Sequence, residues 1–126
     1  MTRLRDRKWR SDRGQVALEY IGFLPVLLLI ALCGIQLGWS AYVVQQAETA
    51  ARTAARAEAR EPGAGVAAGR QSIRSNLAAR AVIDVDPSPD TVVVTVTLPI
   101  NSIVPGVAPH TVRRTAVMPN DDPKGP

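Results

Sequence analysis

The sequence is poor in the residues that stabilise very small domains. It has a single cysteine, Cys33, so no disulfide can form within the chain, and only five of its 126 residues are aromatic. A core must therefore be built from valine, isoleucine, leucine and alanine. Because a chain of this length buries only a thin core, we expect additional packing against its own long helix or against other subunits.

Charge is absent from one long stretch between Glu19 and Glu48, where 28 consecutive residues are uncharged. An α-helix rises ~1.5 Å per residue, so roughly 20 apolar residues cross a ~30 Å hydrocarbon core. The sequence therefore predicts a transmembrane helix over residues 15–42, in contact with the lipid bilayer. Cys33 follows a leucine where a lipoprotein signal requires a small residue, so we interpret it as an apolar residue of the span.

Positive charge is confined to the start of the chain. Residues 1–14 carry a net charge of +4, whereas residues 15–126 have nine basic and nine acidic side chains. Because the main body has no net positive charge to bind phosphate backbones, a nucleic-acid partner is disfavoured. Because basic flanks stay cytoplasmic, we expect a single-pass protein of the bacterial cell membrane, with its N-terminus cytoplasmic and its C-terminus extracytoplasmic.

Groups that carry catalysis are also scarce. The one histidine, His110, has no cysteine or cluster of carboxylates near it in the sequence, and no phosphate loop or nucleophile motif occurs. Asp84, Asp86 and Asp90 flank a proline turn, and we interpret them as solvated turn residues rather than a calcium site. The sequence predicts neither an enzyme nor a bound metal or cofactor.

The sequence after the span predicts a helical extension and a small mixed domain. Residues 43–61 are rich in alanine and free of glycine and proline, and Pro62 and Gly63 then end the helix. One stripe of alanines at helical spacing faces either the chain's own strands or another subunit. The fold class is thus an α+β membrane protein, in which a long N-terminal helix continues outside the membrane.

The remaining residues predict a short helix and a small antiparallel β-hairpin in an extracytoplasmic domain. Thr and Val alternate in the first strand, which indicates one buried face. The second strand has a weaker pattern, and a short third strand at 81–85 is an option. The expected ranges are 66–81 for the helix, 91–98 and 110–118 for the strands, 66–118 for the domain and 119–126 for a disordered tail.

A single acidic residue enters the apolar helix at a defined position. Gly14 follows the basic leader and precedes Gln15, and Glu19 is the fifth residue after this glycine, with Tyr20 next. This pattern resembles a class III prepilin-type signal, and the Glu-Tyr pair resembles the Flp branch of type IV pili. With the single span, the Ala/Arg helix and the Val/Thr-rich β-element, the chain looks like the TadE-like pseudopilins of tight-adherence pilus systems.

Over residues 13–60 the resemblance is in specific residues and their spacing, whereas beyond them it is only in the order of helices and strands. It implies cleavage after Gly14 by a membrane-embedded aspartyl prepilin peptidase, so that the mature chain begins at Gln15. It also implies a structural or assembly role in a pilus or related secretion filament, with other pilins and membrane platform proteins as partners. The alternative is an uncleaved single-pass anchor that displays a small binding domain, in which Glu19 is an interfacial residue.

Several residues of the span suit contacts with other helices or with the interface. Gly34 and Gly38 form a G-x-x-x-G pattern, which permits close helix packing but also occurs as ordinary membrane-helix composition. Gln36 lies between them and is a candidate for a hydrogen bond to another helix. Trp39 and Tyr42 fit an aromatic belt at the outer interface.

Overall fold

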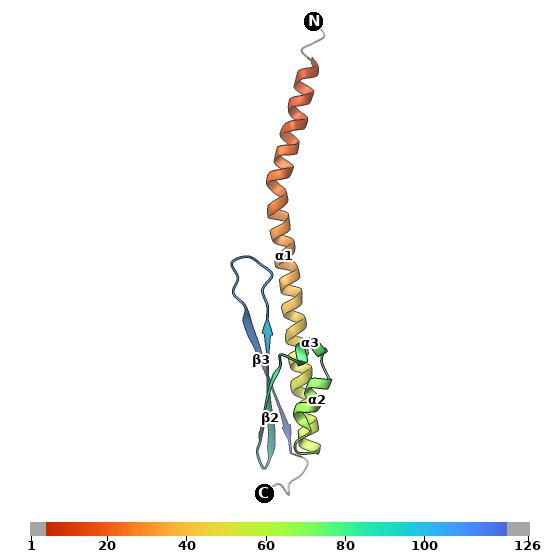
Figure 1. The fold of residues 1–126 in the computed structure, drawn as a ribbon, viewed down its shortest axis with the longest axis vertical. Coiled ribbons are helices and arrows are strands. Elements are labelled where there is room, and N and C mark those ends of the chain that lie inside the picture. Colours follow the sequence, from red (N-terminus) through yellow and green to blue (C-terminus); the bar gives the residue numbers. More distant parts are fainter. Residues whose placement is uncertain (1–4, 121–126) are drawn as a thin grey trace.

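The molecule is a long rod that carries a small domain along one half of its length (Figure 1). The structure, a computed structural model, describes the backbone of residues 5–120 and the side chains of residues 13–120. Its elements are α1 (Arg5–Arg60), α2 (Gly65–Gln71), α3 (Ser75–Ala78), β1 (Val82–Pro87), β2 (Thr91–Ile100) and β3 (His110–Pro119). This is the predicted α+β architecture, with a three-stranded antiparallel sheet.

The helix α1 has 56 residues and is about 84 Å long at 1.5 Å per residue. It continues through Pro25 and ends at Arg60, just before Pro62, which lacks the N–H that a further turn would need. It begins at Arg5, whereas the sequence places its start near Gln15. The leader contains no proline, and its arginines and lysine are good helix formers, so the one glycine at position 14 does not interrupt the helix.

The strands form a sheet in the order β1-β2-β3, with both pairs antiparallel. The alternation predicted for the central strand is confirmed: every second residue of β2 is buried, from Val92 to Ile100. The third strand is present as β1, which pairs Val82 with Thr97. Pro119 closes β3, and residues 121–126, within the predicted tail, lie outside the described residues.

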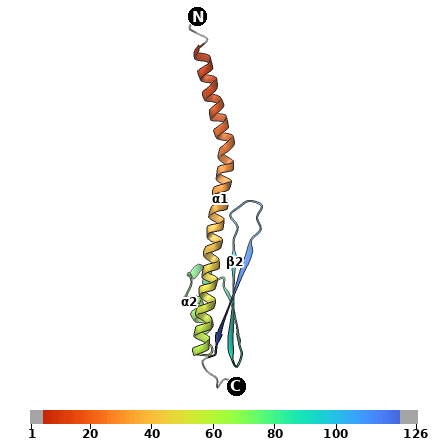
Figure 2. The same cartoon turned by 180° about the vertical axis from the view of Figure 1, so that it is seen from behind.

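The core lies between the second half of α1 and the sheet, while α2 lies along another side of the helix (Figures 1 and 2). The alanine stripe of α1 is therefore covered by this chain's own strands and by α2. Small alanine side chains let the sheet approach the helix closely, and the larger valines and Leu98 of β2 fill the space. The buried residues of α1 are Val43, Ala47, Ala50, Ala51, Ala54, Ala55 and Ala59.

The helix predicted over residues 66–81 is divided into α2 and α3. After α2, the Ser72 hydroxyl donates a hydrogen bond to the Gly69 carbonyl over 2.7 Å. The backbone N–H of Arg74 binds the side-chain oxygen of Gln46 on α1 at 3.3 Å instead of continuing a helical ladder. The break lets Ile73 and Leu77 both enter the core.

Candidate membrane and assembly site

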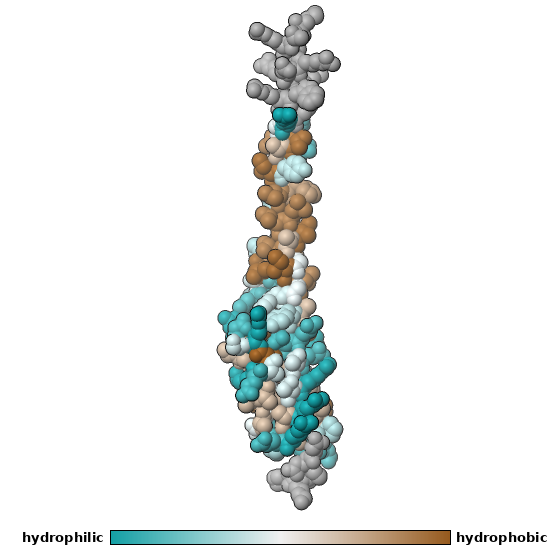
Figure 3. All heavy atoms as spheres, turned by 90° about the vertical axis from the view of Figure 1, so that its right-hand side faces the viewer, coloured by the Kyte–Doolittle hydropathy of each residue, from teal (hydrophilic) through white to brown (hydrophobic). Residues whose placement is uncertain are grey.

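The first half of α1 stands free of the domain. Between residues 13 and 35 every side chain is exposed except Leu32, which is half-buried. Figure 3 shows this part as a continuous apolar band between the grey leader and the polar domain. The helix is long and apolar enough to cross a membrane, and none of its most apolar stretch is buried by the protein. These features indicate a membrane-anchored protein.

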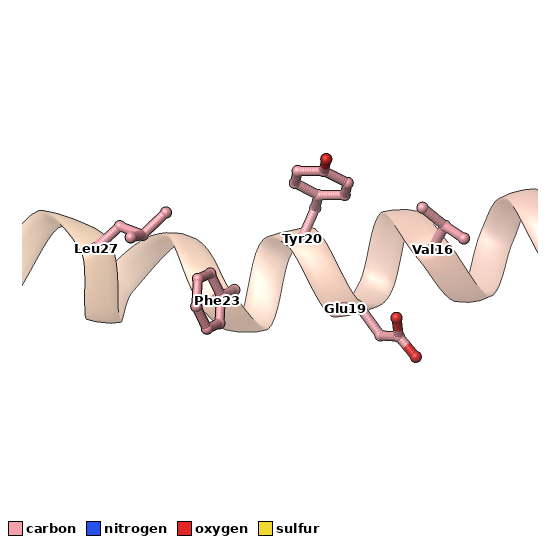
Figure 4. Close-up of a pocket in the computed structure, with 5 residues that line it drawn as sticks. All are labelled: Val16, Glu19, Tyr20, Phe23 and Leu27. Atoms are coloured by element: carbon pink, nitrogen blue, oxygen red, sulfur yellow. The ribbon is translucent and has the colours of Figure 1, made fainter.

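Glu19 and Tyr20 lie on neighbouring faces near the start of this band. Figure 4 shows the Glu19 carboxylate and the Tyr20 ring pointing to different sides of the helix. Both residues line a shallow depression together with Val16, Phe23 and Leu27. Tyr20 is 76% exposed, and Glu19 is exposed as well. Among the side chains that the structure describes, none binds the Glu19 carboxylate, so an acidic group sits on an otherwise apolar surface.

Gly14 and Gln15 lie one turn before Glu19 on the same helix. Both residues are exposed, and a side chain placed on Gly14 would meet no atom within 4 Å. The peptide bond between them is thus open to a partner within the part of the chain that the structure describes. Glycine also weakens the helix locally by ~1 kcal/mol relative to alanine.

Gly34 and Gly38 leave an open strip on the span. Neither glycine has any atom within 4 Å of the position that a side chain would take. The chain's own domain therefore does not use this strip in the described structure. It remains available for the close approach of another helix.

Gln36 is buried, and its partner is within the same chain rather than on another helix. Its side-chain amide donates to the carbonyl of Asn101 over 3.2 Å, and its side-chain oxygen accepts from the N–H of Ile103 over 2.9 Å. These bonds tie the loop between β2 and β3 to the end of the span. A lone glutamine in an apolar run signalled a buried polar contact, but nothing in the sequence identified residues 101–103 as its partner.

Trp39 and Tyr42, predicted as an aromatic belt, are half-buried and pack against the core of the domain. Their ring centroids are 5.6 Å apart, and the guanidinium of Arg74 lies 5.9 Å from the centre of the Tyr42 ring. The junction between span and domain is therefore a packed aromatic contact. One consequence is that the domain cannot pivot at this point without losing apolar burial.

Glu58 is a structural residue that the sequence analysis did not single out. It is only 8% exposed, and its carboxylate accepts hydrogen bonds from the N–H groups of Gly63, at 2.8 Å, and Gly65, at 2.9 Å. A side chain at Gly65 would lie 2.8 Å from this carboxylate, and one at Gly69 would lie 3.0 Å from Ala54. Close approach of α2 to α1 thus requires the two glycines, a role that the sequence analysis did not assign to them.

The histidine and the three aspartates considered in the sequence analysis do not form a common site in the described structure. His110 is exposed at the start of β3, and Asp84, Asp86 and Asp90 are exposed around the β1–β2 turn. Within residues 13–120 no group of three or more histidine, cysteine or acidic side chains is placed to hold a metal ion.

Comparison with protein families places the helix in a known family model. Residues 14–56 match the model of a family described as TadE-like protein, which confirms the resemblance seen in the sequence. This match implies a structural component associated with tight-adherence pili of the Flp type. Searches of curated proteins and of solved structures found no match to the chain.

Proposed function

From the TadE-like match over residues 14–56, we propose that the chain is a pseudopilin or minor pilin-like component of a tight-adherence pilus or related secretion filament. A prepilin peptidase removes residues 1–14, and the mature subunit joins other pilins and membrane platform proteins. The N-terminus is cytoplasmic before the cut, and the domain is extracytoplasmic. The uncleaved anchor predicted as an alternative differs from this proposal at the processing step.

The proposal rests chiefly on the match, which begins at Gly14, the last residue of the leader to be removed. The exposed apolar surface of residues 13–35 supports it, because a helix that packs in a filament must not be covered by its own domain. The alanine-rich second half, in contrast, is covered by the domain. The chain thus presents one half of α1 to other molecules and uses the other half for its own core.

The position of the cut determines what the product retains. A conventional signal peptide is cut beyond its apolar segment, which removes that segment. Hydrolysis of the Gly14–Gln15 peptide bond adds water across the C–N bond, giving a carboxylate on the leader and an ammonium on Gln15. The charged leader is lost, and the whole apolar helix remains with the subunit.

After the cut, the new ammonium and Glu19 lie one helical turn apart. An ionised carboxylate in the centre of the hydrocarbon costs at least ~2.5–3.5 kcal/mol, but Glu19 is close enough to the end of the span to reach the interface. Within a filament of packed helices this escape is lost, and the carboxylate needs a cation. We assign that role to the N-terminal ammonium of a neighbouring subunit, with Tyr20 beside the pair.

Gly34 and Gly38 provide the second assembly feature of the proposal. Because both positions are open in the structure, the backbone of another helix can approach them without displacing a side chain. The two features lie on the free half of α1, about 22 Å apart at 1.5 Å per residue from Glu19 to Gly34. Together they fix both the register and the closeness of helix packing.

The experiment is to measure the intact mass of the protein from cells that contain the complete pilus machinery. We expect a mass corresponding to residues 15–126, with or without one N-methyl group. The Gly14→Leu variant is the control: its larger side chain should block the cut and leave the full-length mass, while membrane insertion stays unchanged. Recovery of only the full-length chain from wild-type cells would reject the pseudopilin function and favour the uncleaved anchor.

A further inference from the structure

The loop between β2 and β3 reaches past the domain to the level of the span. In Figure 1 the hairpin runs along α1 toward the N-terminus, and the loop lies beside the middle of the helix; Figure 2 shows the same arrangement from behind. The hydrogen bonds from Gln36 to Asn101 and Ile103 fix this position. Residues 101–109 therefore sit next to the apolar part of α1.

The position of Gln36 gives the depth of the loop. It precedes Trp39, the last residue of the apolar run, by three residues, or about 4.5 Å along the helix axis. Leu32, one turn further into the span and on the same face, is the one half-buried residue between 13 and 35. When the apolar run occupies the hydrocarbon core, the loop is level with the edge of that core rather than with the aqueous phase.

The loop has an uncharged, partly apolar composition, which suits contact with the lipid interface. No Asp, Glu, Lys or Arg occurs from Thr91 to Val112. Ile103 and Val107 are 50% and 49% exposed, so two apolar side chains of the loop are left partly uncovered by the domain. The next charged residue after the loop is Arg113 on β3.

Several backbone N–H groups of the loop do not depend on water for a hydrogen bond. Its tip is a turn in which the N–H of Val107 binds the carbonyl of Val104 at 3.3 Å, with Pro105 second and Gly106, at φ +82°, third, as in a type II turn. The Ser102 hydroxyl donates to the Val104 carbonyl, and the two prolines have no N–H. The N–H groups of Ile103 and Val107 are thus bonded, and Pro105 and Pro109 have none, which lowers the cost of placing these parts of the backbone near lipid.

From the placement and the composition, we propose that the β2–β3 loop inserts its apolar tip, Ile103 to Val107, into the lipid interface beside the span. The loop contacts lipids of the leaflet on the same side of the membrane as the folded domain. The protein then has two membrane contacts, the helix and the loop, and Gln36 joins them. This inference depends on the span crossing the membrane, and it holds whether or not Gly14 is cleaved.

The test uses the full-length protein in phosphatidylcholine vesicles, with Cys33→Ala to remove the native thiol. An environment-sensitive fluorophore is attached in separate variants to Val107→Cys at the tip and to Val117→Cys on β3. Val117 is a matched control, because it is also an exposed valine, at 58%, but lies near the other end of the sheet. Neither residue belongs to the core, so both variants should fold.

We expect the label at position 107 to be quenched by lipids spin-labelled near the headgroup and to be several-fold less accessible to aqueous iodide than the label at position 117. Adding Val107→Asp to a chain labelled at Ile103→Cys should return that label to water. Equal iodide quenching at positions 107 and 117, without quenching by lipid, would overturn the proposal. Protection from both quenchers would also overturn it, because it would indicate contact with a second copy of the chain.

Discussion

Buried polar groups in this protein serve to dock one segment onto another. Glu58 and Gln36 are the two buried polar side chains in the described core, and each accepts or donates hydrogen bonds across more than one element. Leaving a buried donor or acceptor without a partner costs ~1–3 kcal/mol, more than such a bond contributes net. We therefore expect these two positions to tolerate substitution poorly, although neither is near the proposed processing site.

Glu58→Ala should destabilise the domain by about 1–3 kcal/mol, because it removes both acceptors of the Gly63 and Gly65 N–H groups. Glu58→Gln should have a smaller effect, since its one oxygen can still accept one of these bonds. The measurement is urea unfolding of the full-length protein in a mild detergent. The control is Glu61→Ala, an exposed position that should change the unfolding free energy by about 0.5 kcal/mol or less. Equal losses at positions 58 and 61 would contradict the docking role.

At the scale of elements, the central contact is that of β2 and β3 with the second half of α1. The Thr/Val alternation of β2 was sufficient to predict its buried face, because one residue in two must point to the same side of a strand. The alanine stripe predicted a close contact but not its partner, since small residues suit a sheet or a second helix equally. Long-range pairings such as Gln36 with Ile103 have no local signal at all.

Gln36→Leu tests whether the loop is held by the span. The substitution keeps the apolar volume but removes both hydrogen bonds to residues 101 and 103. Water can partly replace the lost hydrogen bonds, so we expect the free energy of detaching the loop to fall by about 1 kcal/mol. This change corresponds to a roughly fivefold faster amide exchange in residues 101–109. Exchange in the centre of β2 should not change. Gln45→Leu, at an exposed position of the same helix, is the control, and faster loop exchange in that variant would remove the assignment to Gln36.

At the scale of the whole molecule, one half of α1 is exposed and the other half is covered by the domain. The long uncharged run predicted the exposed, membrane-length half, whereas the roles of the basic leader and of Glu19 stay predictions. The helix α1 begins ten residues before its predicted start at Gln15, because the arginines and the lysine of the leader favour a helix. At the break between α2 and α3, the Arg74 N–H binds the side chain of Gln46, a contact over 28 residues that has no local signal in the sequence.

Glu19→Ala should leave insertion and cleavage intact but strongly reduce incorporation into fibres. Without the carboxylate, the ammonium of a neighbouring Gln15 would be buried without a partner, at a cost of several kcal/mol. The measurement is the amount of cleaved variant in sheared surface fibres relative to wild type. Glu48→Ala is the matched control, because this exposed glutamate pairs only with Arg52 on the surface, at 3.2 Å. Equal recovery of wild type and Glu19→Ala would remove the carboxylate from the assembly mechanism.

The aromatic junction at Trp39 and Tyr42 has a mechanical consequence. From Trp39 to Glu61 the chain contains neither glycine nor proline, and the sheet and α2 are packed along this same stretch of α1. No hinge therefore separates the end of the span from the domain, and the two move as one rigid body. When axial force or torsion acts on the buried half of α1, the domain must translate and rotate with it, so that load is transmitted through the helix rather than absorbed by a linker.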